Sequence, residues 1–271
     1  MNFPENTRCL PVVQLDYFCA MQYSLKKSLG QHFLKDEEVS KKIIEALKQH
    51  DFSSLLEVGP GAGALTKYLL KLPDINFKAV ELDEEKVRYL EHTYPSIKDK
   101  IIHKDFLSID PPFENQFTLI GNFPYNISTQ IVFKVLEWKQ QVPVMIGMFQ
   151  KEVGQRIASQ PGSKVYGILS VLTQAFYEVN YLFDVSEESF NPPPKVKSGV
   201  LMFKRKSEIV EMRSEKHFFL LVKTAFNQRR KMLRNGVRGL FDEATLKNEI
   251  FSKRAEQLTI EQFAGLTFEM R

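Results

Sequence analysis

The chain has 271 residues, of which 43% are hydrophobic and 26% are charged, and its formal net charge is +4 at pH 7. This length fits one large α/β domain, or a catalytic domain of roughly 180 residues with a smaller appendage. The apolar stretches are too short to span a bilayer, and the only two cysteines are Cys9 and Cys19. We therefore expect a soluble, cytoplasmic protein with no membrane contact, no disulfide framework and no metal site.

The N-terminal residues carry no recognisable leader. The first twenty residues lack a charged segment followed by a continuous apolar one, so no signal peptide is predicted. Met21 stands just before the basic pair Lys26-Lys27 and offers an internal start, which would leave residues 1–20 untranslated. We treat residues 1–23 as an extension that precedes the first domain.

Short β-type runs and segments with helical spacing alternate along the first part of the chain. The β-type runs are residues 55–58, 77–80, 101–103, 117–120 and 144–148. The helical segments are residues 38–49, 64–71, 84–93 and 128–139. This alternation predicts an α/β domain with a mostly parallel, Rossmann-like sheet, whose ligand site lies at the carboxyl ends of the strands.

A glycine-rich loop, residues 57–63, follows the first predicted strand and precedes a helical segment. Gly59 and Gly61 allow the turn and let a ligand approach the backbone, a feature that dinucleotide-binding dehydrogenases share. Glu81 ends the next strand, where its carboxylate can accept hydrogen bonds from both hydroxyls of a ribose. Together these residues predict a cofactor that contains adenosine.

Two further strand ends favour S-adenosylmethionine over NAD. Asp105 and Phe106 follow the third strand and place an acceptor beside a flat apolar ring, as an adenine requires. The tetrapeptide 122–125 follows the fourth strand, and a dehydrogenase has no use for it. Taken singly, Glu81 could be a surface carboxylate and Asp105 a helix cap. At the ends of successive strands they favour a class I methyltransferase sheet that binds S-adenosylmethionine and releases S-adenosylhomocysteine.

The tetrapeptide Asn122-Phe123-Pro124-Tyr125 suits methylation of an adenine amino group. The lone pair of adenine N6 is delocalised into the ring, so catalysis needs acceptors that draw the amino group toward tetrahedral geometry and a bound geometry that allows in-line attack. The side-chain oxygen of Asn122 and a main-chain carbonyl before or at Pro124 can be these acceptors. Tyr125 can stack on a base that has swung out. In isolation the same four residues would most often be a tight turn.

The composition changes toward the C-terminus. Residues 190–196 include three consecutive prolines, which exclude a helix and predict a rigid extended loop. A β-like run at residues 200–203 is followed by three helical segments, residues 214–235, 242–252 and 259–270. We place the catalytic domain at residues 24–200 and a small helical RNA-binding domain at residues 201–271, with the boundary between residues 186 and 206.

Positive charge is concentrated in this second part. Residues 186–271 contain 17 Lys and Arg against 11 Asp and Glu, a balance of +6, which leaves −2 for residues 1–185. Residues 223–241 contain no acid, and on one continuous helix their basic side chains would lie near one another. The expected phosphate contacts are Lys223, Arg229, Arg230, Lys231, Arg234 and Arg238, extended toward the active site by Lys195, Lys197 and residues 204–206. The alternative is a solvated charged face.

Taken together, the motifs resemble one family. Their positions are residues 28–34, 57–63, 121–128, 150–153, 190–198 and 225–231. Over residues 24–270 the chain is similar to the dimethyladenosine transferases of small-subunit ribosomal RNA, whose bacterial members are the kasugamycin-sensitivity enzymes.

The resemblance implies dimethylation at N6 of two adjacent adenosines in a hairpin loop near the 3′ end of 16S rRNA, within an immature small subunit and by a monomeric enzyme. The cofactor contacts that it implies are His32, Leu34, Gly59, Glu81, Asp105 and Asn122. It also implies that Phe190 helps Tyr125 to hold the target base. Many relatives have Asn in place of His32, which leaves the contact of this side chain open, and often Leu in place of Phe123, which should alter only packing.

Three alternatives remain. A macrolide-resistance-type methylase of large-subunit rRNA shares the loop and the tetrapeptide, but the proline loop and residues 226–231 favour the small-subunit enzyme. An assembly factor without activity would not need Glu81, Asp105, Asn122 and Tyr125 together. A DNA adenine methylase would usually carry Asp in place of Asn122.

Overall fold

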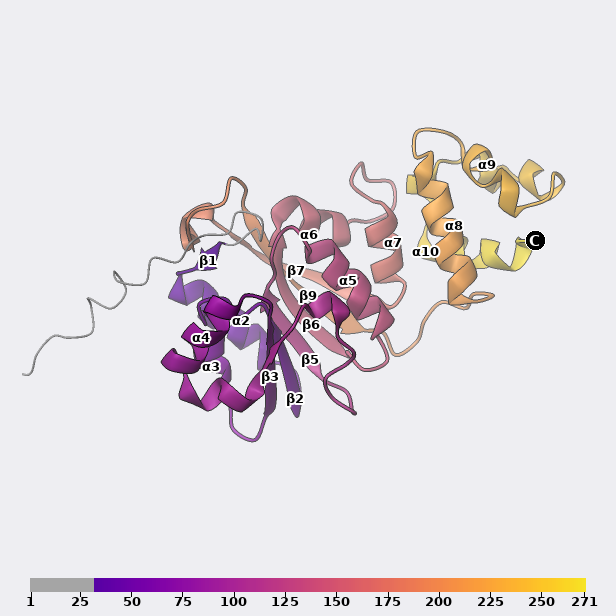
Figure 1. The fold of residues 1–271 in the computed structure, drawn as a ribbon. Coiled ribbons are helices and arrows are strands. Elements are labelled where there is room, and N and C mark those ends of the chain that lie inside the picture. The colour runs from indigo at the N-terminus through magenta and orange to yellow at the C-terminus, as the bar shows by residue number, and fades with distance from the viewer. Residues whose placement is uncertain (1–31) are drawn as a thin grey trace, which may run out of the picture.

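The computed structural model describes residues 32–271, which form a helix-covered sheet followed by a smaller helical part (Figure 1). The predicted extension, residues 1–23, and the internal start at Met21 lie outside the described residues. Across residues 32–271, no helix is both long and apolar enough to cross a membrane. The same residues contain no cluster of His, Cys, Asp or Glu side chains suited to a metal ion.

The main sheet has seven strands in the order β4-β3-β2-β5-β6-β9-β7. Its five parallel strands are β2 (Ser54–Val58), β3 (Asn76–Glu81), β4 (Ile101–His103), β5 (Thr118–Asn122) and β6 (Val144–Gln150). Two antiparallel strands complete the sheet, namely β9 (Ser198–Arg205) and β7 (Tyr177–Val185). The predicted Rossmann-like α/β fold is confirmed, and all five parallel strands lie where the β-type runs predict them.

The edge strand β7 is missing from the sequence prediction. Its register on β9 shifts between Tyr181 and Phe183, and its burial does not alternate regularly. An irregular edge strand has a weak period-two pattern, which accounts for the omission. Because β9 lies between β6 and β7, the sheet continues to Arg205, the last residue of β9 and close to the end of the expected boundary interval.

Helices connect the strands. They are α2 (Glu37–Leu47), α3 (Thr66–Leu69), α4 (Glu84–Thr93), α5 (Ser128–Glu137), α6 (Lys151–Ile157) and α7 (Ile168–Gln174). Short 3-10 turns lie at Pro95–Lys100, Phe106–Ser108 and Glu187–Ser189. The Asp36 carboxylate caps α2 by accepting from the amides of Glu38 and Val39, and it also accepts from Ser189 Oγ at 2.9 Å. This contact ties the start of the described chain to the proline loop.

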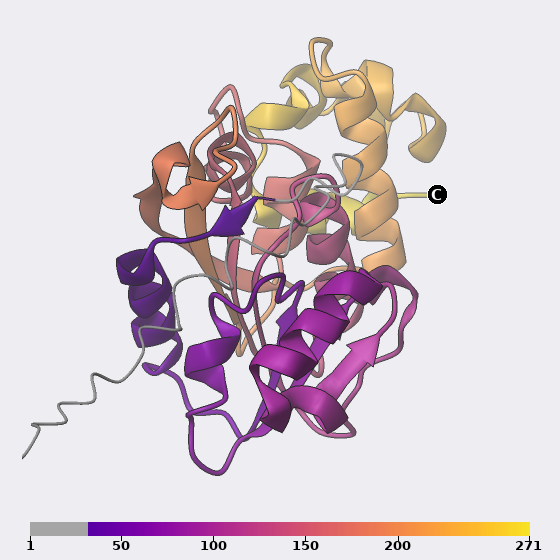
Figure 2. The ribbon, with the colours of Figure 1, turned by 60° about the vertical axis from the view of Figure 1, so that its left-hand side comes forward.

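A second, two-stranded sheet joins the same two regions. β1 (Phe33–Leu34) pairs antiparallel with β8 (Phe190–Asn191). Figure 2 shows β1 beside the orange segment that contains β8, although the two are far apart in sequence. The pairing places residues 32–34 over the carboxyl ends of the parallel strands, where a ligand site is expected.

The sheet is buried on both faces. In β5 and β6, Leu119 and Met145 belong to one hydrophobic cluster, whereas Ile120 and Ile146 belong to another on the opposite face. Strands buried on both faces read as continuous apolar runs, which is how they could be recognised in the sequence. The first cluster also contains Phe218 and other side chains of the C-terminal part, so the two parts share one core.

The C-terminal part contains α8 (Glu215–Asn227), α9 (Leu233–Gly236) and α10 (Ile260–Leu266), drawn in orange and yellow in Figure 1. Its 3-10 turns are Arg238–Leu240, Thr245–Lys247, Glu249–Ser252, Ala255–Gln257 and Thr267–Glu269. Residues 242–252 therefore form short turns rather than the predicted helix.

The prediction of one continuous helix over residues 214–235 is wrong. α8 ends at Asn227, and the Lys231 amide donates to the Gln228 carbonyl in a turn. Residues 223–241 contain no acid, so a helix continued beyond Asn227 would gain no ion pairs between residues three or four apart. The Leu233 amide instead donates to the Lys253 carbonyl at 2.7 Å. Lys223 therefore lies on a different helix from Arg234.

Candidate active site

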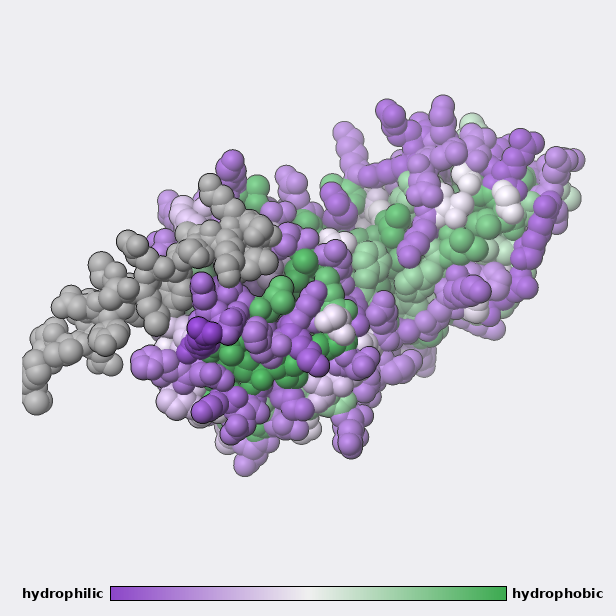
Figure 3. All heavy atoms as spheres, viewed as in Figure 1, coloured by the Kyte–Doolittle hydropathy of each residue, from purple (hydrophilic) through white to green (hydrophobic). Residues whose placement is uncertain are grey.

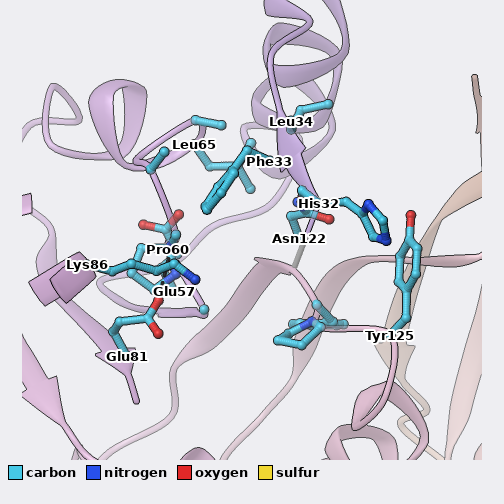
Figure 4. Close-up of a pocket in the computed structure, with 16 residues that line it drawn as sticks. His32, Phe33, Leu34, Glu57, Pro60, Leu65, Glu81, Lys86, Asn122 and Tyr125 are labelled. Atoms are coloured by element: carbon cyan, nitrogen blue, oxygen red, sulfur yellow. Dashed lines mark hydrogen bonds between the residues drawn. The ribbon is translucent and has the colours of Figure 1, made fainter. Parts of the chain in front are cut away.

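Two adjoining cavities lie at the carboxyl ends of β2, β3 and β5. One, of about 650 Å³, lies between the glycine loop, residues 32–34 and the tetrapeptide 122–125 (Figure 4). The other, of about 580 Å³, is lined by Asp105 and Phe106. Gly59, Glu81 and Pro124 line both cavities. They lie at the sheet edge where a parallel α/β fold binds its ligands.

The glycine loop is held in a conformation that favours glycine. Gly59 and Gly61 have φ angles of +67° and +58°, in the left-handed region. A Cβ atom on Gly59 would meet the Pro124 ring at 3.4 Å, and one on Gly61 would meet the Phe33 ring at 3.5 Å. The loop backbone is therefore exposed to the cavity and close to the tetrapeptide, as a ligand cradle requires.

Glu81 is fixed by backbone amides. One carboxylate oxygen accepts from the amide of Gly61 at 3.2 Å, and the other accepts from the amides of Leu82 and Asp83, both at 3.0 Å. The residue is buried but lines both cavities. The oxygen that accepts from Gly61 keeps a lone pair for a further donor, so the carboxylate is oriented before a ribose hydroxyl arrives.

Glu57 is a buried carboxyl group that lines the first cavity. No role for it is predicted from the sequence. It accepts a hydrogen bond from Thr66 Oγ1 at 2.7 Å. Burial, with a smaller contribution from the negative charge of Glu81, raises the pKa of Glu57 to about 8. The group is thus largely protonated at neutral pH. Its position at the start of the glycine loop indicates that Glu57 lies near the site, but sequence alone does not reveal that its side chain is buried.

Asp105 fits both interpretations of its sequence position, a helix cap and a ligand contact. Its Oδ1 accepts from the Leu107 amide at 2.9 Å and caps a 3-10 turn. The residue also lines the second cavity together with Phe106, which is buried. Because a carboxylate has two oxygens, capping by one leaves the other for a ligand.

The orientation of the Asn122 amide follows from its partner. Its Nδ2 donates to the main-chain carbonyl of His32 at 3.3 Å. A carbonyl oxygen can only accept, so the amino group faces His32 and Oδ1 is left for the cavity. The next residue, Phe123, is buried against Gly121 and Gly147, where a Cβ atom would lie 2.7 Å and 2.1 Å from its ring. This packing anchors the tetrapeptide to β5 and β6.

The Tyr125 ring is held at both its hydroxyl and its face. Its hydroxyl bonds to the buried Ser198 Oγ at 2.5 Å, and its ring lies 5.5 Å from the His32 ring with an interplanar angle of 32°. Burial raises the pKa of Tyr125, with the Ser198 bond opposing it. The phenol therefore stays neutral at physiological pH, which suits stacking rather than proton abstraction. Figure 4 shows His32 between Asn122 and Tyr125.

The side chain of Phe190 lies in the hydrophobic core. Its side chain is 1% exposed and belongs to the hydrophobic cluster beneath β1, where its backbone pairs with Leu34. It lines neither cavity. A contact of Phe190 with the target base therefore stays a prediction. Leu34, by contrast, lines the first cavity as the resemblance implies.

The basic residues fall into two groups. The exposed side chains among the predicted phosphate contacts are those of Lys195, Lys197, Lys204, Lys223, Arg230, Lys231 and Arg238. Arg229 donates to the Lys164 carbonyl, and Arg234 donates to the Phe251 carbonyl at 3.4 Å, so both also serve the packing of the C-terminal part. In Figure 3, hydrophilic side chains surround the outer end of this part. The basic side chains come from several segments rather than from one helix face.

Comparison with known proteins gives a consistent result. The family model described as "Ribosomal RNA adenine dimethylase" matches residues 22–268. The chain is 55% identical over 246 residues to the Ribosomal RNA small subunit methyltransferase A of Flavobacterium johnsoniae, covering 89% of this chain and 94% of that protein. It is 52% identical to the protein of the same name from Parabacteroides distasonis, covering 89% and 92%.

Solved structures agree on the fold. A dimethyladenosine transferase from Plasmodium falciparum superposes with a TM-score of 0.74 at 23% identity, covering 88% of this chain and 97% of that one. The 23S rRNA methyltransferase ErmE gives a TM-score of 0.69 at 23% identity, covering 88% and 99%. With the family model spanning nearly all described residues and half of the positions shared with curated relatives, the chain belongs to the ribosomal RNA adenine dimethylase family.

Proposed function

We propose that this protein transfers methyl groups from S-adenosylmethionine to N6 of two adjacent adenosines in a hairpin loop near the 3′ end of 16S rRNA. The observation that carries the proposal is the orientation of Asn122, whose amino group is engaged by His32 so that Oδ1 faces the cavity. An acceptor beside a glycine loop and a stacking tyrosine is what methylation of an exocyclic amine needs. The similar proteins named as small-subunit methyltransferases support the choice of RNA.

The described residues fit the proposed cofactor. The left-handed glycines leave the loop backbone open, Glu81 is oriented by amides for ribose hydroxyls, and Asp105 with Phe106 suits an adenine. His32 and Leu34 would close the first cavity from above. When bound, S-adenosylmethionine supplies a methyl group on an activated sulfonium, so the protein itself needs to supply position rather than a strong nucleophile.

The tetrapeptide would hold the base amine. Asn122 Oδ1 would accept one N6 hydrogen, and a main-chain carbonyl would accept the other. The Pro124 carbonyl already accepts from the Ile127 amide at 3.2 Å, which favours the carbonyl of Phe123 as the second acceptor. Tyr125 would stack on the base, a contact worth about 1–3 kcal/mol. No strong base is required, because the nitrogen becomes acidic once it carries the incoming methyl group.

We further infer that the substrate is the RNA of an immature small subunit, that the enzyme acts in the cytoplasm as a monomer, and that exposed basic side chains contact phosphates. The excess of Lys and Arg over Asp and Glu after residue 186 supports phosphate contacts by this part of the chain. A large-subunit methylase and an inactive assembly factor are the competing functions. The second is disfavoured because Glu81, Asp105, Asn122 and Tyr125 all line the two cavities.

The decisive experiment supplies labelled methyl donor to the purified protein with undermethylated small subunits, naked 16S rRNA or large subunits. We expect label in N6,N6-dimethyladenosine of the small-subunit RNA, found by nuclease digestion and chromatography. Label confined to large-subunit RNA would assign the protein to the other substrate. Absence of label from every RNA, with the donor bound, would favour the assembly factor.

A further inference from the structure

Lys86 is a buried lysine whose side chain enters the first cavity. It lies in the first turn of α4, is 4% exposed, and lines the cavity together with Glu81 and the glycine loop. Figure 4 shows its side chain extending between Phe33 and Glu81. The sequence predicts no role for this lysine, because it lies inside a helical segment rather than at the end of a strand.

The position of Lys86 is unfavourable for a cation. Burial removes water from the ammonium group, and the first turn of a helix favours acids, here Glu84 and Glu85, over bases. Two contacts offset part of this cost. The Asp83 carboxylate lies 3.9 Å from Nζ, and the centroid of the Phe33 ring lies 5.0 Å from it. A charge that is kept inside a cavity at such a cost is a candidate ligand contact.

Phe33 determines where in the cavity the ammonium group of Lys86 lies. A Cβ atom added to Gly61 would lie 3.5 Å from the Phe33 ring, so this ring lies directly beside the glycine loop. The Gly61 amide also donates to the Glu81 carboxylate. The ammonium group therefore lies where the glycine loop, the Phe33 ring and Glu81 meet.

The charges of the proposed cofactor indicate which of its groups suits Lys86. S-adenosylmethionine carries two positive groups, the sulfonium and the α-ammonium, and one negative group, the α-carboxylate. With the ribose at Glu81 and the adenine at Asp105, the methionine part would lie in the first cavity. Among the described residues that line this cavity, Lys86 is the only lysine or arginine. Without this cation, the α-carboxylate would face the like charge of Glu81.

We propose that the ammonium group of Lys86 binds the α-carboxylate of S-adenosylmethionine. The inference rests on the proposed function, because that function supplies the cofactor. A lysine has a flexible stem, so Nζ can turn toward the carboxylate while the stem stays packed. Lys86 then selects compounds that carry the complete amino acid over adenosine compounds that lack its carboxylate. It takes no part in the methyl transfer itself.

The test uses calorimetry to compare two ligands of the full chain, S-adenosylmethionine and decarboxylated S-adenosylmethionine, which lacks only the α-carboxylate. We expect the native protein to prefer the first compound by about tenfold to a hundredfold, the strength of a hydrogen bond between charged groups. Lys86→Met removes the ammonium group and keeps a long unbranched side chain. This variant should therefore reduce the preference to less than about threefold.

Lys42→Met is the matched control. Lys42 also lies over an aromatic ring, that of Phe183, with Nζ 5.9 Å from the centroid, but it is exposed on α2 and lines neither cavity. Its preference should equal that of the native protein. Because the preference is a ratio of two affinities of one sample, an unfolded fraction in Lys86→Met lowers the apparent stoichiometry and leaves the ratio unchanged.

Two results for Lys86→Met would overturn the proposal, namely an unchanged preference and an equal loss of affinity for both compounds. Equal binding of the two compounds by the native protein would overturn it as well. Failure of the native protein to bind S-adenosylmethionine would instead remove the cofactor assignment, and this inference with it. The titrations contain no RNA, so their outcome does not depend on which RNA the protein methylates.

Discussion

The proposed cofactor side and the proposed base side of the candidate site are constructed differently. On the cofactor side, Glu81 is held by three backbone amides of nearby residues, and the glycine loop hydrogen-bonds to the adjacent strand. On the base side, Tyr125 is held by Ser198 and lies against His32, which are distant in sequence from it and from each other. The first side is therefore preformed by local structure, and the second depends on tertiary contacts.

The largest expected effect concerns Asn122, which lies between the two sides. Asn122→Ala removes the acceptor for the amine while leaving the glycine loop and Glu81 intact, so kcat should fall about 10²- to 10³-fold. Donor binding should change much less. The measurement is single-turnover methylation together with calorimetric donor titration. Asn115→Ala, in an exposed loop, is the control. Full turnover in Asn122→Ala would remove its proposed role.

The pH dependence of stability can show whether Glu57, on the proposed cofactor side, is a neutral acid. The pKa of Glu57 is raised by burial to about 8, above its usual value of 4.5, so the folded state binds this proton more tightly than the unfolded chain. The stabilisation of the folded state by this proton is complete below pH 4.5 and is lost as pH rises toward 8. Its contribution should fall by up to about 1.4 kcal/mol per pH unit.

Urea unfolding at pH 5.5, 7 and 8.5 measures this contribution. Glu57→Gln keeps the shape of the side chain and cannot ionise, so the stability of the native protein relative to this variant should decline between pH 5.5 and pH 8. A difference that stays constant with pH would show that Glu57 is already ionised in the folded protein.

A substitution at Gly59 tests the glycine loop of the proposed cofactor side. An alanine at this position would adopt a left-handed φ, which costs about 1–2 kcal/mol, and its Cβ would lie 3.4 Å from the Pro124 ring. We expect Gly59→Ala to lower donor affinity about tenfold. Gly239→Ala is the matched control because no atom lies within 4 Å of its added Cβ. Unchanged donor binding in Gly59→Ala would mean that the loop does not cradle the ligand.

The smallest expected effect lies farthest from the chemistry. Arg230 and Lys231 are exposed in the turn after α8, so reversing both charges should weaken subunit binding and reduce the salt dependence of the affinity. The slope of log affinity against log salt should decrease by about 2. Lys71→Glu combined with Lys98→Glu, both exposed in the sheet domain, makes the same change in net charge and is the control. If the salt dependence of the affinity is the same in the native protein and the charge-reversed variant, the two side chains are solvated and do not contact RNA.

The same contrast explains what could be predicted from the sequence. Gly59, Glu81, Asp105 and Asn122 each lie at or just after the carboxyl end of a strand. Parallel strands bring these ends together, so local patterns sufficed to predict which residues line the two cavities. The contacts of His32 could not be predicted, because they depend on β1 pairing with a strand about 160 residues later.

One other prediction failed for lack of tertiary information. The helix over residues 214–235 looked continuous by periodicity, but the bond from Leu233 to Lys253 redirects the chain after Asn227. Hydrophobic spacing identifies helical segments, and it does not show where a long-range hydrogen bond ends them.

The core shared by the sheet and the C-terminal helices has a mechanical consequence. Phe218 and Leu221 of α8 belong to the same buried cluster as Phe149 and Phe203 of the sheet, and Lys139 pairs with Glu215 at 2.8 Å across the junction. The two parts should consequently unfold in a single transition rather than separately. A rigid junction also sets one separation between the basic turn and the base pocket. Under the proposed function, this separation would favour an RNA whose phosphates and swung-out adenine match the same span.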